Sequence, residues 1–480
     1  MWGGLHLKRT QVPSVFISIA GHPLEGQIST IMVSVKVVLL QALAYLLPLA
    51  AGFPAPRADG PLKPVDDPFY DPPAGFESEV PGTILRHRKT PFPIAAFGFA
   101  EVNLESSHQV LYRTTDAFGK AVATVSTILI PHNADTSKLL SYQVAQDAAD
   151  PNCSPSFAFQ HESENGNALA LIMPQLEFIF ITAALNKGWV VTAPDHLGPE
   201  SAFLSNILSG HAVLDNIRAA LASTEFTNVT SDATVTMWGY SGGSLASGFA
   251  AELQPEYAPE LKIAGAALGG TVPEILPVVD ASNKGLFTGL LPAGIRGLSK
   301  VYPEIAKLID ENLIPEKKAE FEKTDHLCLT GNILEYLGKD VYSYVKNKDV
   351  FRDPIATKVL NENAMGHNIP DIPLFIYKSA GDEISPVNAS DALVDKYCDG
   401  GAQLEYKRDK LSEHALLEII GAPDAFFWLE DRMEGAPAEK GCKRSTHFTT
   451  LSDPRTIAAL GSGLVQVLLS FISLPIGPPF

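Results

Sequence analysis

Basic residues are scarce in this chain. Its 480 residues include 36 lysines and arginines against 54 aspartates and glutamates, and the formal net charge is −18 at pH 7. This balance argues against a nucleic-acid partner and disfavours tight binding to anionic membrane surfaces. It fits a soluble protein whose copies repel one another, and we expect a monomer.

The first sixty residues predict a targeting signal rather than part of the fold. From Met32, a short basic start leads into an apolar stretch and then into small residues before Phe53. Residues 32–52 are therefore typical of a secretory signal peptide. A signal anchor or a core helix is the alternative, but the apolar run is short for a membrane span and Pro48 interrupts it. Residues 1–31 would serve no purpose before a signal peptide, so we interpret them as a spurious upstream extension with translation starting at Met32.

Cysteines are also few. An even number of cysteines in a chain that carries a secretory leader predicts that they pair as disulfides. Acceptor sites for N-glycosylation suit the same extracellular compartment. The cysteines are Cys153, Cys328, Cys398 and Cys442, and the glycosylation sites are Asn152, Asn228 and Asn388.

The patterns after the leader divide the chain into an arm, a core and an insertion. Residues 53–81 are rich in proline, glycine and aspartate and predict an extended arm over the surface. Residues 82–271 and 367–480 alternate strand and helix patterns, which predicts an α/β core with a mostly parallel central sheet. Residues 272–366 show amphipathic helical stretches broken by prolines and no strand pattern, so we expect a helical cap.

Within these regions the patterns predict individual elements. Strands are expected at Val110–Thr115, Ala121–Ile130, Leu139–Ala145, Trp189–Ala193, Ile263–Leu268, Pro373–Tyr377 and Gln403–Lys407, and helices at Leu176–Leu185, Ile305–Leu313, Ile333–Val345 and Ala415–Ile420.

The last segment, residues 457–480, is strongly apolar. It could be mistaken for a membrane span or for the tail of a lipid-anchor signal. Gly461, Gly463 and Pro475 argue against a stable span. We expect a last helix on the core followed by an extended flap.

The stretch Val235–Ala246 carries the strongest chemical signal in the chain. β-branched and aromatic residues lead into Gly239-Tyr240-Ser241-Gly242-Gly243, and small residues follow. This is the strand, sharp turn and helix of a nucleophile elbow. A serine there adopts a strained backbone conformation, and the two flanking glycines, Gly239 and Gly243, are needed because a Cβ would clash with a neighbouring strand or helix. The backbone N–H of Gly242 would then point at a developing oxyanion.

A nucleophilic serine needs an imidazole base, and the imidazole needs a carboxylate that holds its tautomer. His414 follows a predicted strand by a short loop and opens a helix, which favours it over His447 as the base. Asp382 lies on a tight turn after the strand Pro373–Tyr377 and is favoured as the acid, with Glu383 as its nearest rival.

Several spaced motifs in this order resemble the fungal secretory lipases, the lipase A-like family of α/β-hydrolases. The resemblance runs from about Pro81 to the C-terminus. The motifs are Tyr142–Gln143 with Asp147, Cys153–Ser156, Ala193–Phe203, Ala212–Ala220 and Gly239–Gly243. Asp195, Asp215 and Arg218 belong to these motifs too, and we favour structural roles for them as turn caps and buried ion pairs.

The resemblance implies Ser241, Asp382 and His414 as the catalytic triad. It also implies an oxyanion hole made by the backbone N–H groups of Asp147 and Gly242, with Asp150 as an alternative to Asp147. A helical cap that holds an acyl tunnel and a C-terminal flap over the site belong to the same expectation.

Four cysteines allow three pairings. The proximity of these motifs favours Cys153–Cys328 together with Cys398–Cys442. No cysteine flanks His414, so a disulfide that pins that loop in a relative would be absent here.

Together these features predict a secreted, extracellular serine-dependent lipase that hydrolyses triacylglycerols and other acyl esters through an acyl-enzyme. It would use neither a metal nor a cofactor and would meet a lipid–water interface transiently. A carboxylesterase for short or bulky esters is the alternative within enzymes, since the triad does not separate the two. A non-catalytic lipid-binding protein is the alternative outside enzymes, but loss of the serine, the histidine or the acid would have been its signature.

Overall fold

The computed structural model describes residues 60–96, 100–163, 171–461 and 476–477. The described residues belong to one compact unit, Pro56–Phe480. The predicted upstream extension, the signal peptide and most of the C-terminal flap lie outside them. Of the last apolar segment, the structure describes a helical stretch at 454–461 and then Ile476, which pairs with Val102 in an isolated parallel bridge.

In the described part of the chain, a sheet of ten strands organises the fold, in the order β1-β4-β5-β7-β6-β8-β9-β10-β11-β12. The strands are β1 Ile84–Lys89, β4 Ser106–Thr115, β5 Ala121–Ile130, β6 Asp135–Gln143, β7 Trp189–Pro194, β8 Thr234–Tyr240, β9 Ile263–Gly269, β10 Leu374–Ser379, β11 Leu404–Asp409 and β12 Cys442–His447; a separate pair holds β2 Ala95–Ala96 and β3 Ala100–Glu101.

The sheet is antiparallel at one end and parallel through the rest. β1, β4, β5 and β7 pair antiparallel, whereas every pair from β7 to β12 is parallel. β6 lies between β7 and β8, so the chain leaves β6 toward one side and later returns on its other side. Such a point, where the strand order reverses, leaves a crevice beyond the carboxyl ends of the strands. The loop after β6 and the turn after β8 both open onto it.

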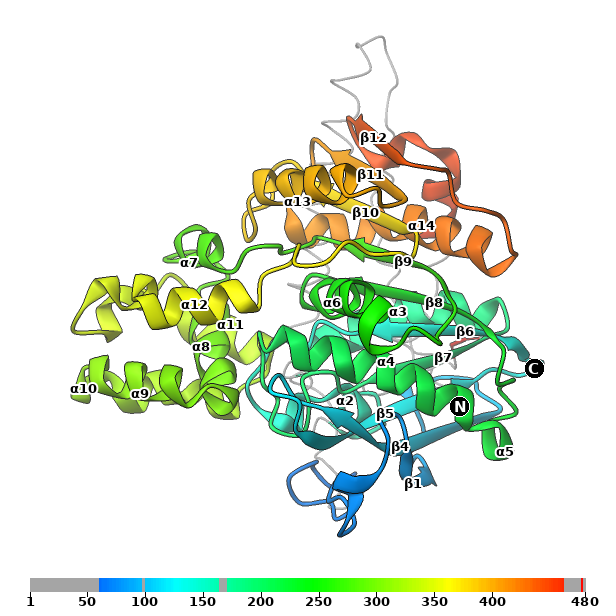
Figure 1. The fold of residues 1–480 in the computed structure, drawn as a ribbon, viewed down its shortest axis with the longest axis horizontal. Coiled ribbons are helices and arrows are strands. Elements are labelled where there is room, and N and C mark those ends of the chain that lie inside the picture. The colour runs from blue at the N-terminus through cyan, green and yellow to red at the C-terminus, as the bar shows by residue number, and fades with distance from the viewer. Residues whose placement is uncertain (1–59, 97–99, 164–170, 462–475, 478–480) are drawn as a thin grey trace, which may run out of the picture. The chain divides into compact units, whose positions relative to one another are not determined.

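Helices cover both faces of the sheet (Figure 1). Trp238 of β8 contacts the rings of Phe180 and Phe426, which places α3 and α14 on one face. On the other face Met237 shares a buried apolar cluster with Leu245 and Phe249 of α6. The core helices are α2 Pro155–Ala158, α3 Ile172–Asn186, α4 Asn206–Ala222, α5 Thr224–Thr227, α6 Gly242–Tyr257, α13 Val387–Asp399 and α14 His414–Met433.

Between β9 and β10 the chain forms a group of helices without a strand in the part that the structure describes, and Figure 1 shows this group beside the sheet. Prolines at the first or second helical position begin four of the helices, because Pro lacks the N–H that a helix start leaves unused. The helices are α7 Leu276–Ser282, α8 Leu290–Val301, α9 Pro303–Asn312, α10 Pro315–Phe321, α11 Leu329–Tyr336 and α12 Pro354–Glu362.

One helix predicted in this region is wrong. Instead of a continuous helix at Ile333–Val345, α11 ends at Tyr336 and a 3-10 turn follows at Val341–Tyr344. Gly338 between them has a φ of 68°, which no right-handed helix accommodates. The spacing of the apolar residues alone does not indicate that the helix ends here.

The described part of the arm before the sheet is held by specific contacts. Phe69 is buried with Leu111 and Val125. Asp67 accepts a bond from Arg88 at 2.5 Å, and the hydroxyl of Tyr70 lies 2.7 Å from that of Ser156. The described part of the arm therefore packs on β1, β4 and β5.

Two disulfides join distant segments. Cys153, in the loop after β6, is bonded to Cys328 at the start of α11, and Cys398 at the end of α13 is bonded to Cys442 at the start of β12. These are the pairs that the sequence favours. The first links the sheet to the helices of 272–366, whereas the second lies within the core.

Candidate active site

Ser241 occupies the turn between β8 and α6. Its backbone has φ 49° and ψ −117°, a conformation that non-glycine residues rarely adopt. Its N–H donates to Gly269 O at 2.9 Å, and its carbonyl accepts from Ser244 N and Leu245 N at 2.9 and 3.1 Å. These bonds hold the strained turn in place and expose the hydroxyl beyond the end of the strand.

The glycines around this serine are required by space. A Cβ on Gly239 would lie 2.2 Å from the carbonyl oxygen of Gly243, and one on Gly243 would lie 1.9 Å from that of Gln143. Both distances are far below van der Waals contact with a rigid backbone. The sharp turn therefore depends on glycine at both positions.

His414 begins α14 and faces the serine. Its Nδ1 donates to Asp382 Oδ2 at 2.7 Å, and its Nε2 lies 2.9 Å from the Oγ of Ser241. Because the carboxylate can only accept, the proton of a neutral imidazole resides on Nδ1, and Nε2 keeps a lone pair for the serine proton. The hydroxyl of Tyr240 donates to His414 O at 2.7 Å and fixes the backbone of the histidine.

The rivals that sequence reasoning considered have other partners. Glu383 accepts the backbone N–H of His414 at 2.7 Å, so it orients the start of α14 rather than the imidazole. His447 lies on β12, where its ring contacts Ser445 at 3.1 Å. The structure thus brings Ser241, His414 and Asp382 together and leaves His447 outside that chain of contacts.

Four donors surround the carboxylate of Asp382. Oδ1 accepts the backbone N–H groups of Ile384 and Ser385 at 2.9 and 2.7 Å. Oδ2 accepts His414 Nδ1 and, at 2.8 Å, the ammonium of Lys378. Burial alone would raise the pKa of Asp382, but the charges and hydrogen bonds of His414 and Lys378 outweigh it and hold this pKa well below its usual range. The carboxylate therefore stays ionised.

The loop after β6 brings Asp147 beside the serine. Asp147 has a positive φ of 44°. Its Oδ1 would lie only 1.9 Å from a Cβ on Gly242, so the side chain of Asp147 occupies the space that a larger residue at 242 would need. Gly242 is the first residue of α6, so its N–H has no acceptor within the helix. Asp150, the alternative, instead accepts the N–H of Asn152 at 3.0 Å and begins a 3-10 turn.

Burial raises the pKa of Asp147 to about 7, against the opposing influence of His414 and of the aspartate's own backbone N–H. Behind the same loop, Glu177 of α3 accepts Tyr142 Oη and Ala145 N at 2.9 and 2.8 Å. Burial raises the pKa of Glu177 well above its usual range and that of Glu418 to about 7. Neither glutamate carries a motif, so sequence reasoning missed them.

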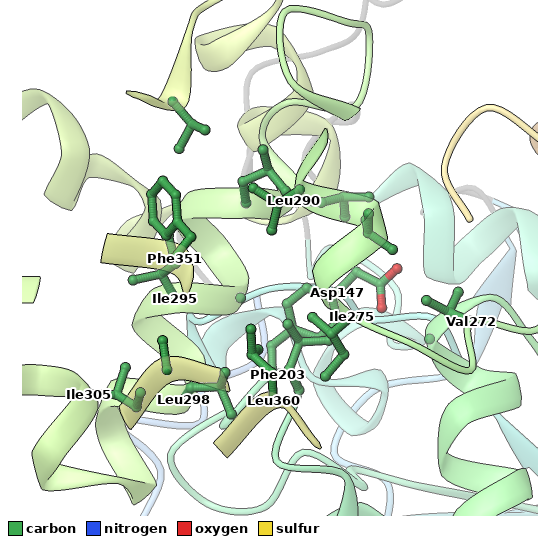
Figure 2. A pocket seen from close by; sticks show the side chains of 18 of the residues that line it. Asp147, Phe203, Val272, Ile275, Leu290, Ile295, Leu298, Ile305, Phe351 and Leu360 are labelled. Atoms are coloured by element: carbon green, nitrogen blue, oxygen red, sulfur yellow. The ribbon is translucent and has the colours of Figure 1, made fainter. Parts of the chain in front are cut away.

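An apolar cavity opens from these groups into the helices of 272–366 (Figure 2). It contains about 930 Å³ free of atoms, including the part open to solvent. Ser241, Gly242 and Asp147 lie on its wall, and most of the remaining lining is aliphatic or aromatic and comes from α7, α8, α9 and α12. Leu290, Leu298, Ile305 and Leu360 are members from these helices, whereas Ile275 directly precedes α7 and Phe351 lies in the 3-10 turn Lys348–Arg352 before α12.

Other residues that the sequence singled out lie away from this cavity. Asp195 accepts Ser156 N at 2.9 Å, and Asp215 accepts Arg218 at 2.7 Å and Thr114 Oγ1 at 2.7 Å. These contacts agree with structural roles.

Of the glycosylation sites, Asn228 and Asn388 are exposed. Asn152 is partly buried, and its side chain accepts Val65 N at 3.4 Å.

Within the described ranges, no group of three or more histidine, cysteine or acidic side chains could hold a metal ion. In the same part of the chain, no helix combines the length and the apolar character needed to cross a bilayer.

Several known proteins are similar to this chain. A family model described as "Secretory lipase" matches residues 163–441. Lipase A of Arthroderma benhamiae is 48% identical over 437 residues, which are 90% of this chain and 92% of that protein. Lipase 1 of Candida albicans is 38% identical over 428 residues, 86% of this chain and 90% of that one. A probable inactive lipase of Mycobacterium tuberculosis is 36% identical over 405 residues, 83% of this chain and 89% of that protein. Similarity alone therefore does not separate active from inactive relatives.

Solved structures share the fold. Candida antarctica lipase A in its closed state matches with a TM-score of 0.75 at 28% identity, over 88% of this chain and 99% of that one. An esterase of Xanthomonas oryzae that degrades rice cell walls matches with a TM-score of 0.54 at 15% identity, over 75% and 97%. The second likeness concerns the fold alone.

Proposed function

The chain belongs to the secretory lipase family and is a lipase, an ester hydrolase, and we propose that Ser241, His414 and Asp382 perform its chemistry on acylglycerols and other acyl esters. The observation that carries this proposal is the placement of Ser241 Oγ, which lies 2.9 Å from His414 Nε2 at the wall of the apolar cavity.

The mechanism follows from the contacts. Ser241 Oγ attacks the ester carbonyl while its proton passes to His414 Nε2, and Asp382 stabilises the imidazolium through Nδ1. The negative charge that develops on the carbonyl oxygen is stabilised by the backbone N–H groups of Gly242 and Asp147. When the tetrahedral intermediate collapses, the C–O bond to the alcohol breaks and His414 returns the proton to the leaving oxygen.

An acyl group then remains on Ser241. Water attacks its carbonyl, His414 takes one proton from that water, and the second tetrahedral intermediate releases the fatty acid as the proton returns to Ser241 Oγ. Each step exchanges a single proton between oxygen and Nε2, so Asp382 remains a carboxylate throughout. Its lowered pKa is consistent with that role.

The residues 272–366 act in this proposal as the cap that binds the acyl chain, and 82–271 with 367–480 act as the catalytic core. Burial of one methylene group on an apolar wall stabilises a complex by about 0.8 kcal/mol. A cavity whose wall is nearly all aliphatic therefore favours long acyl chains over acetate.

We also propose that the protein is a secreted monomer that meets a lipid–water interface only transiently. The signal-like segment 32–52 and the two disulfides support export. The net charge of −18 supports repulsion between copies and from anionic surfaces. Size-exclusion chromatography of the protein from culture medium tests both points: an exported protein that elutes as a dimer would contradict the monomer.

The decisive experiment is a hydrolysis series on p-nitrophenyl esters from two carbons to eighteen. We expect kcat/KM to rise from acetate to a medium or long chain. A steady fall from acetate upward would contradict the lipase assignment of the site and favour a carboxylesterase for short esters. Absence of hydrolysis of any ester would favour a protein that binds lipids without catalysis.

A further inference from the structure

Lys378 is a buried lysine beside the catalytic carboxylate. It lies on β10, where its neighbours Leu374–Tyr377 are apolar and buried, and its side chain is 0% exposed. A lysine inside a sheet carries a desolvation penalty that an apolar residue would avoid. Packing alone therefore does not explain a lysine at this position.

The contacts of Lys378 lead directly to the triad. Its Nζ donates to Asp382 Oδ2 at 2.8 Å and to the carbonyl of Thr271 at 2.8 Å. His414 Nδ1 donates to the same Oδ2 at 2.7 Å. Asp382 Oδ2 therefore accepts hydrogen bonds from both the ammonium of Lys378 and the imidazole of His414.

A purely structural explanation accounts for little of this. The carbonyl of Thr271 also accepts the hydroxyls of Ser385 and Ser390 at 3.4 and 3.2 Å, so it does not depend on Lys378. Asp382 already has two backbone donors on Oδ1 and His414 on Oδ2. Lys378 adds one further donor to Oδ2 and, with it, a full positive charge.

On this basis, and resting on the proposed function of the triad, we propose that Lys378 is a positioning residue that acts through Asp382. Its ammonium fixes the carboxylate toward His414 and, by its charge, opposes protonation of the imidazole. Hydrolysis, which requires the neutral imidazole, then continues at lower pH than it would with Asp382 and His414 alone.

Other charged groups surround the pair. Burial lowers the pKa of the Lys378 ammonium, while the carboxylates of Asp382, Glu383 and Asp391 act to raise it. Asp147 and Glu418 also lie close enough to His414 to interact with its charge. In their ionised forms these acidic groups favour the imidazolium, and Lys378 is the cation that donates to Asp382 among the described residues.

The test compares Lys378→Met and Lys378→Gln with the wild-type enzyme. The first removes both charge and donors, and the second keeps an amide donor without charge. The matched control is Lys407→Met: Lys407 lies on the adjacent strand β11 and donates to Asp424 instead of the triad. For each protein, kcat/KM on a soluble short-chain ester and the rate at which a phosphonate labels Ser241 are measured from pH 4 to pH 9.

We expect both Lys378 variants to move the acid limb of these profiles to higher pH by about one unit. This is the scale expected for the loss of one charge that contacts the same carboxylate oxygen as the imidazole in a partly screened site. On the acid limb this shift corresponds to a rate roughly tenfold lower than that of the wild type at the same pH. Lys378→Gln should keep more of the plateau rate than Lys378→Met, because it still donates to Asp382. Lys407→Met should leave the limb where it is.

Other outcomes overturn the proposal. An unchanged acid limb in both variants would leave Lys378 with no electrostatic effect on the triad, and a uniform loss at every pH, or failure of both variants to fold, would make it a structural residue. Ser241→Ala separates this result from the proposed function. If that variant keeps its activity, the triad itself is wrong, whereas if it is inactive and the Lys378 profiles are unchanged, only the role of Lys378 fails.

Discussion

The two walls of the cavity are built on different principles. On the sheet side, hydrogen bonds of 2.7 to 2.9 Å fix Ser241, His414 and Asp382. Ser241 follows β8, His414 begins α14, and Asp382 lies in the turn after β10. On the side of the proposed cap, residues 272–366, the lining from α7 to α12 is apolar and contributes packing without fixed hydrogen-bond directions. The hydrogen-bonded wall depends on the identity and the position of each residue, whereas the apolar wall depends only on the volume that its apolar side chains fill.

This difference means that chemistry and substrate choice can change separately. A change of one atom in the hydrogen-bonded wall should remove catalysis for every ester. A change in the apolar wall should alter which chains fit and leave the reacting groups as they are.

The largest effect is expected at the hydrogen-bonded wall. Ser241→Ala and His414→Ala should each lower kcat by about 10⁶-fold for all chain lengths, because members of a triad act as a unit. The measurement is steady-state hydrolysis of a short and a long p-nitrophenyl ester by purified, folded variants.

His447→Ala is the control for this prediction, since its ring contacts Ser445 rather than the triad. It should keep most of the wild-type rate. Inactivation by His447→Ala together with an active His414→Ala would show that the base is misassigned.

The two disulfides test how the walls are joined. Cys153–Cys328 spans 175 residues and links the sheet to the cap, whereas Cys398–Cys442 spans 44 residues within the core. Loop closure predicts that double serine variants lose about 5 and about 4 kcal/mol of unfolding free energy. Urea denaturation measures both losses.

The kinetic consequences should differ more than the stabilities. Loss of Cys153–Cys328 should also lower kcat/KM for long esters, because it releases the cap next to the loop of Asp147. Loss of Cys398–Cys442 should leave kinetics near wild type in the folded fraction. Equal kinetic effects of the two variants would contradict a link between this bond and the acyl site.

The hydrogen-bonded wall was also the part that sequence could predict. The motif around Ser241 is local, and strand patterns such as Ala121–Ile130 agree with β5 residue for residue. Asp382 and His414 followed from their places after predicted strands, and the structure puts them within hydrogen-bonding distance. Local spacing suffices there because sharp turns and strand ends leave few backbone alternatives.

Other features of the site and of the sheet edges could not be predicted from local spacing. Lys378 belongs to a strand whose prediction stopped at Tyr377, although β10 runs to Ser379. Glu177 meets Ala145 across 32 positions in the chain, and no pattern relates the two. The edge strands β1 and β12 were missed because much of their length is exposed, which hides the apolar alternation of a strand. Contacts between distant segments determine these features.

At the apolar wall, a bulky substitution should change chain-length preference alone. Ala356 of α12 lines the cavity and is 8% exposed. Phenylalanine there should displace about three methylene groups of a bound chain, at about 0.8 kcal/mol each. We therefore expect kcat/KM to fall roughly 50-fold for long esters and to stay unchanged for acetate.

Ile355→Phe is the matched control, because Ile355 is the preceding residue on α12 and is 42% exposed. It should leave the chain-length profile as it is. If Ala356→Phe lowers acetate and long-chain hydrolysis equally, the cap influences the reacting groups and the contrast between the two walls fails.

An effect of pH on stability is expected at Asp147, the one titratable side chain among the described residues that line the cavity. Burial raises its pKa from 3.8 to about 7, so between these values the folded protein binds a proton that the unfolded chain has released. The contribution to stability is complete below about pH 4 and is lost as pH rises through 7.

Asparagine cannot titrate, and the stability of the wild type relative to Asp147→Asn should therefore fall with rising pH, by at most about 1.4 kcal/mol per pH unit. Asp195, whose pKa is also raised to about 7 by burial, titrates in both proteins and cancels in the difference. Glu418 cancels only in part, because the charge of Asp147 contributes to the rise of its pKa. Urea unfolding from pH 4.5 to pH 8 measures this difference. Parallel stability curves would mean that Asp147 keeps its charge inside the cavity and that solvent reaches the apolar wall at this point.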